Sequence, residues 1–174
     1  VTAHPYATTN DPVANVNKIP KWITVWLKEK FLFSSKYYKK NYPKKIYIDR
    51  SDSTSNVAHM RSIINEKELV EFLRKKDFSI IRLGDLDFID QVQHFSNADY
   101  IVGLHGAGFA NVSFCKSNTK IIEFKTSKAV RMYEKLAQLN NLKYSSIVSE
   151  PISHAHAKQL GHIKISLNIL EKLI

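Results

Sequence analysis

Apolar positions along the chain fall into two patterns, short continuous runs and helical spacing. The continuous runs are rich in Ile, Val, Phe and Tyr and predict strands at residues 45–49, 78–83, 100–104, 120–124 and 143–148. Apolar residues three or four positions apart predict helices at residues 21–33, 65–76, 87–96, 109–115, 128–139 and 166–174. Asn65 is expected to cap the second of these helices. Because strands and helices alternate, the sequence predicts an α/β fold with a parallel sheet and helices on both faces.

The composition divides the chain into three regions. Residues 1–44 hold a connector with scattered Pro and Asn, followed by the first predicted helix, in which Trp22 and Trp26 are expected to form an aromatic packing face. Residues 45–150 contain all the predicted strands and form the sheet domain. Residues 151–174 form a C-terminal loop and a packing helix.

The glycines concentrate in one stretch, residues 97–123. Gly103, Gly106 and Gly108 are three of the five glycines in the chain, and they lie between a predicted strand and a predicted short helix. This density indicates either positive φ or the close approach of a bulky group. Since backbone N–H groups at the N-terminus of a helix bind anions, we expect a binding site at this turn.

Charge and cysteine content narrow the class of protein. The 174 residues include 26 Lys and Arg against 16 Asp and Glu, and the net charge of +10 favours a polyanionic or phosphorylated partner. A single cysteine excludes an internal disulfide. No apolar stretch approaches the ~20 residues that span a bilayer. The sequence begins at Val1 without an initiator Met, so we expect a longer protein with a further N-terminal part.

Two nucleotide-binding motifs and one hydrolase motif are absent from the sequence. The order of the glycines is G-x-x-G-x-G, which differs from the dinucleotide fingerprint and from the phosphate loop that ends in Gly-Lys-Ser/Thr. The tetrad HGAG at residues 105–108 is similar to the oxyanion-hole motif of some α/β-hydrolases. That class also needs a Gly-x-Ser-x-Gly nucleophile elbow, which does not occur in this sequence, so a hydrolase is disfavoured.

Three runs of sequence carry a resemblance to a known family. They are RSIINEKEL at residues 61–69, SNADYIVGLHGAGFANVSFCKSNTKIIE at residues 96–123 and MYEKLAQLNNLKY at residues 132–144. In this order they resemble the characteristic block of glycosyltransferase family 61, over residues 44–144 and more loosely over the helix before them. The family often has two adjacent arginines in the first run, where this chain has Arg61 followed by Ser62.

The resemblance implies a fold, an activity and partners. Family members have a GT-B architecture of two Rossmann-like domains, invert the anomeric configuration and use nucleotide-activated sugars without a bound metal. Bacterial members are associated with surface polysaccharide synthesis. By resemblance, this chain is the Rossmann-like, donor-binding C-terminal half of a cytoplasmic enzyme with peripheral contact to the inner membrane face. Its expected partners are a nucleotide-sugar donor, a saccharide acceptor and the N-terminal domain of the same protein; no cofactor, metal or nucleic acid is expected.

The glycine turn and two arginines are predicted to bind the diphosphate of the donor. The backbone N–H groups of Gly106, Ala107 and Gly108 can cradle phosphate oxygens without a side chain in the way. Arg50 and Arg61 are the predicted charge partners, because a guanidinium fork matches phosphate geometry and stays protonated. The alternative for both arginines is a surface position that only aids solubility.

Three further residues complete the predicted donor site. His105 is predicted to bond the diphosphate or stabilise the leaving group, and the alternative is a histidine bonded by the backbone of a tight turn. Glu123 is expected at the end of its strand, where it accepts both ribose hydroxyls; a capping or salt-bridging acid is the alternative. Asn111 is predicted to cap the short helix or contact the donor. No residue of the sequence is a convincing catalytic base.

Other candidates are weaker. His154, His156 and His162 imitate metal-ligand spacing, but such imidazoles in a polar loop are more often exposed. Cys115 lies away from the field of a helix N-terminus, so a nucleophilic role is disfavoured. The basic, tyrosine-rich residues 36–45 are interpreted as a solvated connector rather than a lipid or nucleic-acid contact. A second function stays open: a non-catalytic basic module that binds nucleotide, nucleic acid or anionic glycan.

Overall fold

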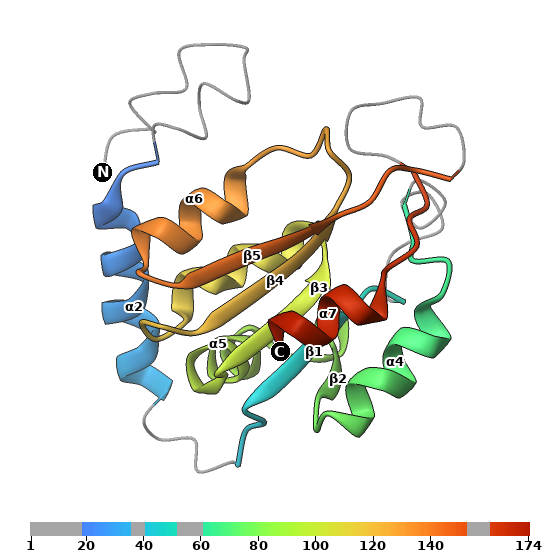
Figure 1. The fold of residues 1–174 in the computed structure, drawn as a ribbon. Helices are drawn as coiled ribbons and strands as arrows, with labels where there is room; N and C mark the ends of the chain where they lie inside the picture. The colour runs from blue at the N-terminus through green and yellow to red at the C-terminus, as the bar shows by residue number, and fades with distance from the viewer. Residues whose placement is uncertain (1–18, 36–40, 52–60, 153–160) are drawn as a thin grey trace.

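The computed structural model contains a sheet of five parallel strands (Figure 1). It describes residues 19–35, 41–51, 61–152 and 161–174. The strands are β1 (Lys45–Asp49), β2 (Ser79–Arg82), β3 (Tyr100–Leu104), β4 (Lys120–Lys125) and β5 (Lys143–Val148). Their order across the sheet is β2-β1-β3-β4-β5. The α/β class and the parallel sheet expected from the sequence are confirmed.

Helices cover both faces of this sheet. They are α2 (Lys21–Ser35), α4 (Glu66–Lys75), α5 (Phe88–Asn97), α6 (Met132–Leu139) and α7 (Leu167–Leu173), with the 3-10 helices η1 (Leu83–Asp85) and η2 (Ala107–Phe114). Helices α4 and α7 lie on one face, whereas α2, α5, α6 and η2 lie on the other (Figure 1). This two-sided cover explains why the strands are apolar runs without alternation.

The order of the strands places a crevice at the carboxyl end of β1. Strand β2 pairs with one side of β1 and β3 with the other, so Tyr47 lies in register with both Ile80 and Val102. The strand order therefore reverses between β1 and β3. In open parallel sheets, ligands bind beyond the carboxyl ends of the strands at such a reversal.

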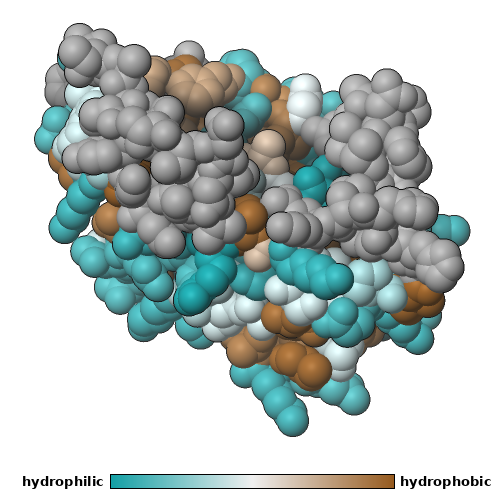
Figure 2. Space-filling model, turned by 90° about the horizontal axis from the view of Figure 1, so that it is seen from above, coloured by the Kyte–Doolittle hydropathy of each residue, from teal (hydrophilic) through white to brown (hydrophobic). Residues whose placement is uncertain are grey.

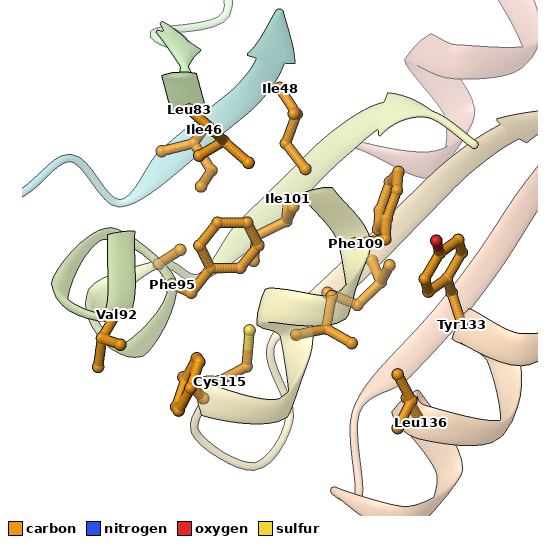
Figure 3. Close-up of a cluster of buried hydrophobic side chains, with 14 residues drawn as sticks. Ile46, Ile48, Leu83, Val92, Phe95, Ile101, Phe109, Cys115, Tyr133 and Leu136 are labelled. Carbon is orange, nitrogen blue, oxygen red and sulfur yellow. The ribbon is translucent and has the colours of Figure 1, made fainter. Parts of the chain in front are cut away.

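Successive residues of each strand pack into different cores. Ile101 belongs to the cluster beneath α5, η2 and α6, and the next residue, Val102, belongs to the cluster beneath α4 and α7. Figure 3 shows the first cluster, in which Phe95, Phe109 and Tyr133 come from three different helices and approach the same face of β3. Full burial of an aliphatic or aromatic side chain stabilises the fold by about 1.5–3 kcal/mol.

Helix α2 is packed by phenylalanine rather than by tryptophan. The ring of Phe31 makes edge contacts with Phe88 at 4.9 Å and with Phe114 at 6.2 Å, between ring centroids. Trp22 and Trp26 remain 53% and 47% exposed. The predicted helix is confirmed. Trp26 packs edge-on against Phe31 at 6.4 Å between centroids but stays about half exposed, and Phe31 rather than the tryptophans makes the contact with α5.

Asn65 does not cap its helix by a side-chain bond, which corrects the prediction for this residue. Its Nδ2 atom donates to the carbonyl of Ile165 at 3.0 Å, and its Oδ1 atom accepts the N–H of Ile165 at 2.9 Å. The side chain thus joins the start of α4 to a segment one hundred residues later. The backbone groups of Ile165 compete successfully for the amide that would otherwise cap the helix.

Two helices differ from the prediction in extent or type. Helix α6 begins at Met132 rather than at residue 128, because a turn in which Ala129 N–H bonds the carbonyl of Thr126 occupies the preceding residues. The helix after the glycine turn is a 3-10 helix that begins at Ala107. Both differences lie next to the carboxyl ends of strands β3 and β4.

No helix in the described residues is long and apolar enough to cross a membrane. The view from above shows hydrophobic residues of the described surface as separate patches among hydrophilic ones (Figure 2). With a net charge of +10, cations outnumber anions over the chain as a whole.

We call the two bonds between Asn65 and Ile165 a clamp, and a substitution distinguishes this clamp from a helix cap. Asn65→Asp should lower the free energy of unfolding by about 1–3 kcal/mol, because Asp cannot donate to the Ile165 carbonyl. As a cap, Asp would be as good as Asn. The control is Ser166→Asp, since Ser166 does cap α7 by accepting the N–H of Ile169; we expect a change within about 0.5 kcal/mol there. If urea unfolding shows that the two substitutions change the free energy of unfolding equally, the clamp is contradicted.

Candidate functional site

A pocket lies where the carboxyl ends of β1 and β3 meet. Its volume is about 230 Å³, and its lining residues are Ile48, Asp49, Arg50, Leu83, Leu104, Gly106, Ala107, Gly108 and Phe109. This position is the reversal of strand order, where a ligand is expected. The fold thus brings Arg50 and the glycine turn, predicted separately along the sequence, to one pocket.

The glycines of the turn are explained by close approach. Gly103, Gly106 and Gly108 do not adopt the left-handed conformation that favours glycine, and Gly106 has an extended backbone with φ of 169°. A Cβ atom on Gly106 would lie 2.6 Å from Nη1 of Arg50, and one on Gly103 would lie 3.1 Å from Cβ of Ile48. Of the two alternatives that the sequence left open, the structure therefore selects close packing. At Gly106 the group that approaches is a guanidinium.

Arg50 is fixed over the turn by the backbone. Its Nη1 atom donates to the carbonyl of His105 at 2.8 Å. The N–H of Phe109 donates to the carbonyl of Gly106 at 3.0 Å, which closes the first turn of η2. The N–H groups of Ala107 and Gly108 precede that first bonded residue, as expected at the start of a helix. A guanidinium and the N-terminus of a helix thus lie side by side.

Arg61 contributes a second guanidinium with unpaired nitrogens. Within the described residues, its Nε and Nη1 atoms are out of contact with solvent and have no hydrogen-bond partner. Burial, with a further contribution from the charge of Arg50, lowers the pKa of Arg61 from its ordinary value. The charges of Tyr133 and Glu123 act in the opposite direction but more weakly. Unpaired buried donors beside a second cation are the condition that a bound anion would satisfy.

A second unpaired group lies at the same edge of the sheet. The hydroxyl of Thr126, the residue that follows β4, is buried without a partner within the described part of the chain. Strands β3 and β4 are neighbours, and the N–H of His105 donates to the carbonyl of Phe124 at 2.8 Å. Unsatisfied buried polar groups are uncommon in folded proteins. Thr126, directly after β4, and Arg61, which is influenced by the charge of Arg50, are therefore candidate contacts for a polar ligand.

Glu123 lies inside its strand, which corrects its expected position at the strand end, since β4 continues to Lys125. Its carboxylate is fully buried and accepts hydrogen bonds from Nδ1 of His105 and from the hydroxyl of Tyr144. The Nζ atom of Lys125 lies 3.7 Å from its Oε2 atom. Contact of Glu123 with a ribose stays a prediction, and in this structure the carboxylate is engaged with protein groups.

Tyr133 is a site residue that the sequence did not reveal. It lies in the first turn of α6, with its ring 5.5 Å from that of Phe109, between centroids (Figure 3). The centroid of its ring lies 5.1 Å from that of His105. Burial, with a contribution from Glu123, raises the pKa of Tyr133 to about 12. Its spacing along the helix is that of any core residue, so no local signal marks it.

Comparison with known proteins decides the family. The model of the family described as Glycosyltransferase 61 matches residues 4–122, which is more than half of the chain. The chain belongs to glycosyltransferase family 61. The predicted family is thereby confirmed, and the match includes all the predicted site residues except Glu123, which follows its last residue.

Curated proteins are similar to part of this chain. It is 32% identical over 107 residues to the "EGF domain-specific O-linked N-acetylglucosamine transferase" of Rattus norvegicus, covering 59% of this chain and 20% of the relative. The protein of the same name from Drosophila melanogaster is 30% identical over 87 residues, covering 48% and 17%. The chain thus spans about a fifth of the length of these relatives.

The remaining candidate residues are bonded to other parts of the protein, are buried, or lie outside the described residues. Nδ2 of Asn111 donates to Oε1 of Gln91 on α5 at 3.0 Å. His154 and His156 fall outside the described residues, and the described residues contain no group of three or more potential metal ligands. Cys115 is buried, and burial raises the pKa of its thiol, which disfavours a nucleophilic role.

Two glycine substitutions test the close packing of the turn. Gly103→Ala should lower the free energy of unfolding by about 1–3 kcal/mol, because its Cβ atom meets the rigid Cβ atom of Ile48 in the core. Gly106→Ala should cost less than about 1 kcal/mol, because the flexible end of Arg50 can move aside. Urea unfolding measures both. A Gly106→Ala variant as unstable as Gly103→Ala would contradict this explanation of the turn.

Proposed function

We propose that this chain binds the nucleotide-diphosphate sugar donor of an inverting glycosyltransferase. Arg50, Arg61 and the N–H groups of Gly106 to Gly108 would hold the diphosphate, and the pocket between β1 and β3 would hold part of the nucleotide. The observation that carries this proposal is the half-buried Arg61, whose Nε and Nη1 atoms are shielded from solvent and lack partners in the described residues. Arg61 does not line the pocket itself, but the pocket, which Arg50 and the glycine turn do line, lies at the reversal of strand order.

The chemistry of inversion explains why positive charge belongs here. In a single displacement, the acceptor oxygen attacks the anomeric carbon while the bond to the diphosphate breaks. Negative charge develops on the leaving diphosphate, and fixed cations and N–H groups stabilise it. A general base must take the proton of the acceptor hydroxyl. That base stands on the opposite side of the sugar from the diphosphate, so we expect it across the cleft, in the other half of a GT-B enzyme.

The proposal also covers the donor sugar, the acceptor and the cellular location of the enzyme. The names of the relatives suggest N-acetylglucosamine as a candidate sugar. The acceptor in those names is an EGF domain, whereas we propose a saccharide acceptor in the synthesis of a surface polysaccharide or glycan. We further propose a cytoplasmic enzyme that contacts the inner face of a membrane. Turnover of UDP-N-acetylglucosamine by the full protein, compared with UDP-glucose, tests the sugar.

The alternative, a basic module that binds anions without catalysis, rests on the net charge of +10. Membership of a glycosyltransferase family favours the enzyme. The two differ in where the charge acts, because the donor site uses two particular guanidinium groups, whereas a basic module uses charge spread over the surface.

Replacement of Arg61 separates binding from stability. In Arg61→Met, we expect the dissociation constant for uridine diphosphate (UDP) or guanosine diphosphate to rise at least about tenfold, because a charge-assisted bond to phosphate is lost. The free energy of unfolding without nucleotide should not fall, because two buried nitrogens of Arg61 are unpaired. Calorimetry and urea unfolding measure the two quantities.

Arg74→Met is the matched control, since Arg74 is exposed in the last turn of α4. It should leave nucleotide affinity unchanged. The donor-site proposal is contradicted if neither nucleotide binds the wild type, or if Arg61→Met binds both as tightly as the wild type does. Tight, salt-dependent binding of single-stranded DNA, weakened equally by both substitutions, would instead support the basic module.

A further inference from the structure

Four hydrogen-bonded polar side chains, three of them buried and that of Tyr144 half-buried, connect the glycine turn to the edge strand β5. Lys125 Nζ donates to the hydroxyl oxygen of Tyr144 at 2.9 Å. The hydroxyl of Tyr144 and Nδ1 of His105 are both bonded to the carboxylate of Glu123, one at each oxygen. The side chains of His105, Glu123 and Lys125 are 5%, 0% and 10% exposed.

The donor and the acceptor of each of these hydrogen bonds can be assigned. An ammonium group can only donate, so the Tyr144 oxygen accepts from Lys125 and its own proton is left for Glu123. Burial and the charge of Glu123 raise the pKa of Tyr144, so its hydroxyl keeps that proton. An ionised carboxylate can only accept, so Nδ1 of His105 carries a proton. The other ring nitrogen, Nε2, points away from Glu123, because Nδ1 is the nitrogen bonded to that carboxylate.

The surroundings of His105 are rich in positive charge. Arg50 bonds its carbonyl, the charge of Arg61 acts on Tyr133, whose ring packs against that of His105, and Lys125 Nζ lies 3.7 Å from Oε2 of Glu123. A bound diphosphate would bring negative charge to this region, and a nearby opposite charge favours the protonated form of an imidazole.

We propose that Glu123, Tyr144 and Lys125 are positioning residues that hold His105 for the diphosphate of the donor. When the diphosphate binds, the ring takes up one proton from solvent on Nε2 and donates this N–H to a phosphate oxygen. The imidazolium then stabilises the charge of the leaving group as the bond to the sugar breaks. This inference rests on the proposed donor site, and it gives Glu123 a role through His105 instead of through the ribose.

The first measurement is calorimetry of UDP binding in two buffers with different enthalpies of ionisation, which counts the protons taken up. The wild-type chain should take up a fraction of one proton near pH 7.5. His105→Asn should take up none, because Asn keeps a donor toward Glu123 but lacks Nε2. It should also bind UDP about tenfold more weakly. His105→Gln, whose amide can reach toward the Nε2 position, should recover part of the affinity without the proton uptake.

The second measurement asks whether Tyr144 acts through His105. Tyr144→Phe should weaken UDP binding by about threefold to fivefold, and it should have no further effect in the His105→Asn background. The control is Tyr47→Phe, because the hydroxyl of Tyr47 also donates to a carboxylate, that of Glu66, at 2.8 Å, but on the opposite face of the sheet. That substitution should not change UDP affinity.

The outcomes separate this inference from the donor site itself. If wild type binds UDP in an Arg61-dependent way but His105→Asn takes up the same number of protons, the inference fails and the donor site stands. Additive effects of Tyr144→Phe and His105→Asn on the binding free energy would remove the positioning role of Tyr144. If wild type binds neither UDP nor guanosine diphosphate, both proposals fail.

Discussion

The site depends on one bond, from the guanidinium of Arg50 to the carbonyl of His105. This bond joins the residue after β1 to the residue after β3, across the reversal of strand order. It holds a fixed positive charge over the start of η2, beside the second guanidinium of Arg61. A glycine at position 106 is needed because the guanidinium occupies the space of a Cβ atom. The backbone of the glycine turn, the side chain of Arg50 and the order of the strands thus all place positive charge where β1 and β3 end.

The rest of the fold holds the carboxyl edge of the sheet in place. Two apolar clusters fix the five strands from both sides, and the clamp from Asn65 to Ile165 ties the C-terminal segment to the start of α4. Within the described residues, the buried side-chain atoms left without a partner belong to Arg61 and Thr126. The core and the pocket share residues, since Leu83 and Phe109 belong to the first apolar cluster and also line the pocket.

Much of the fold follows from the sequence, because buried parallel strands and amphipathic helices have strong local patterns. The strand from Tyr100 to Leu104 and the turn after it are of this kind. Contacts between distant segments have no such pattern. The bond of Asn65 to Ile165, the approach of Tyr133 to His105 and the position of Glu123 within its strand depend on packing and register, which become visible only in three dimensions. The same holds for the unpaired nitrogens of Arg61, since an arginine that is buried and one that is exposed look alike in sequence.

The central claim is that a nucleotide diphosphate binds against the two guanidinium groups and the glycine turn of this family 61 glycosyltransferase. The most direct measurement is a crystal structure of the chain grown with UDP. The account predicts phosphate oxygens within hydrogen-bonding distance of Arg61 and of the N–H groups of Ala107 and Gly108. A diphosphate bound elsewhere on the chain, with the nitrogens of Arg61 still unpaired, would contradict it.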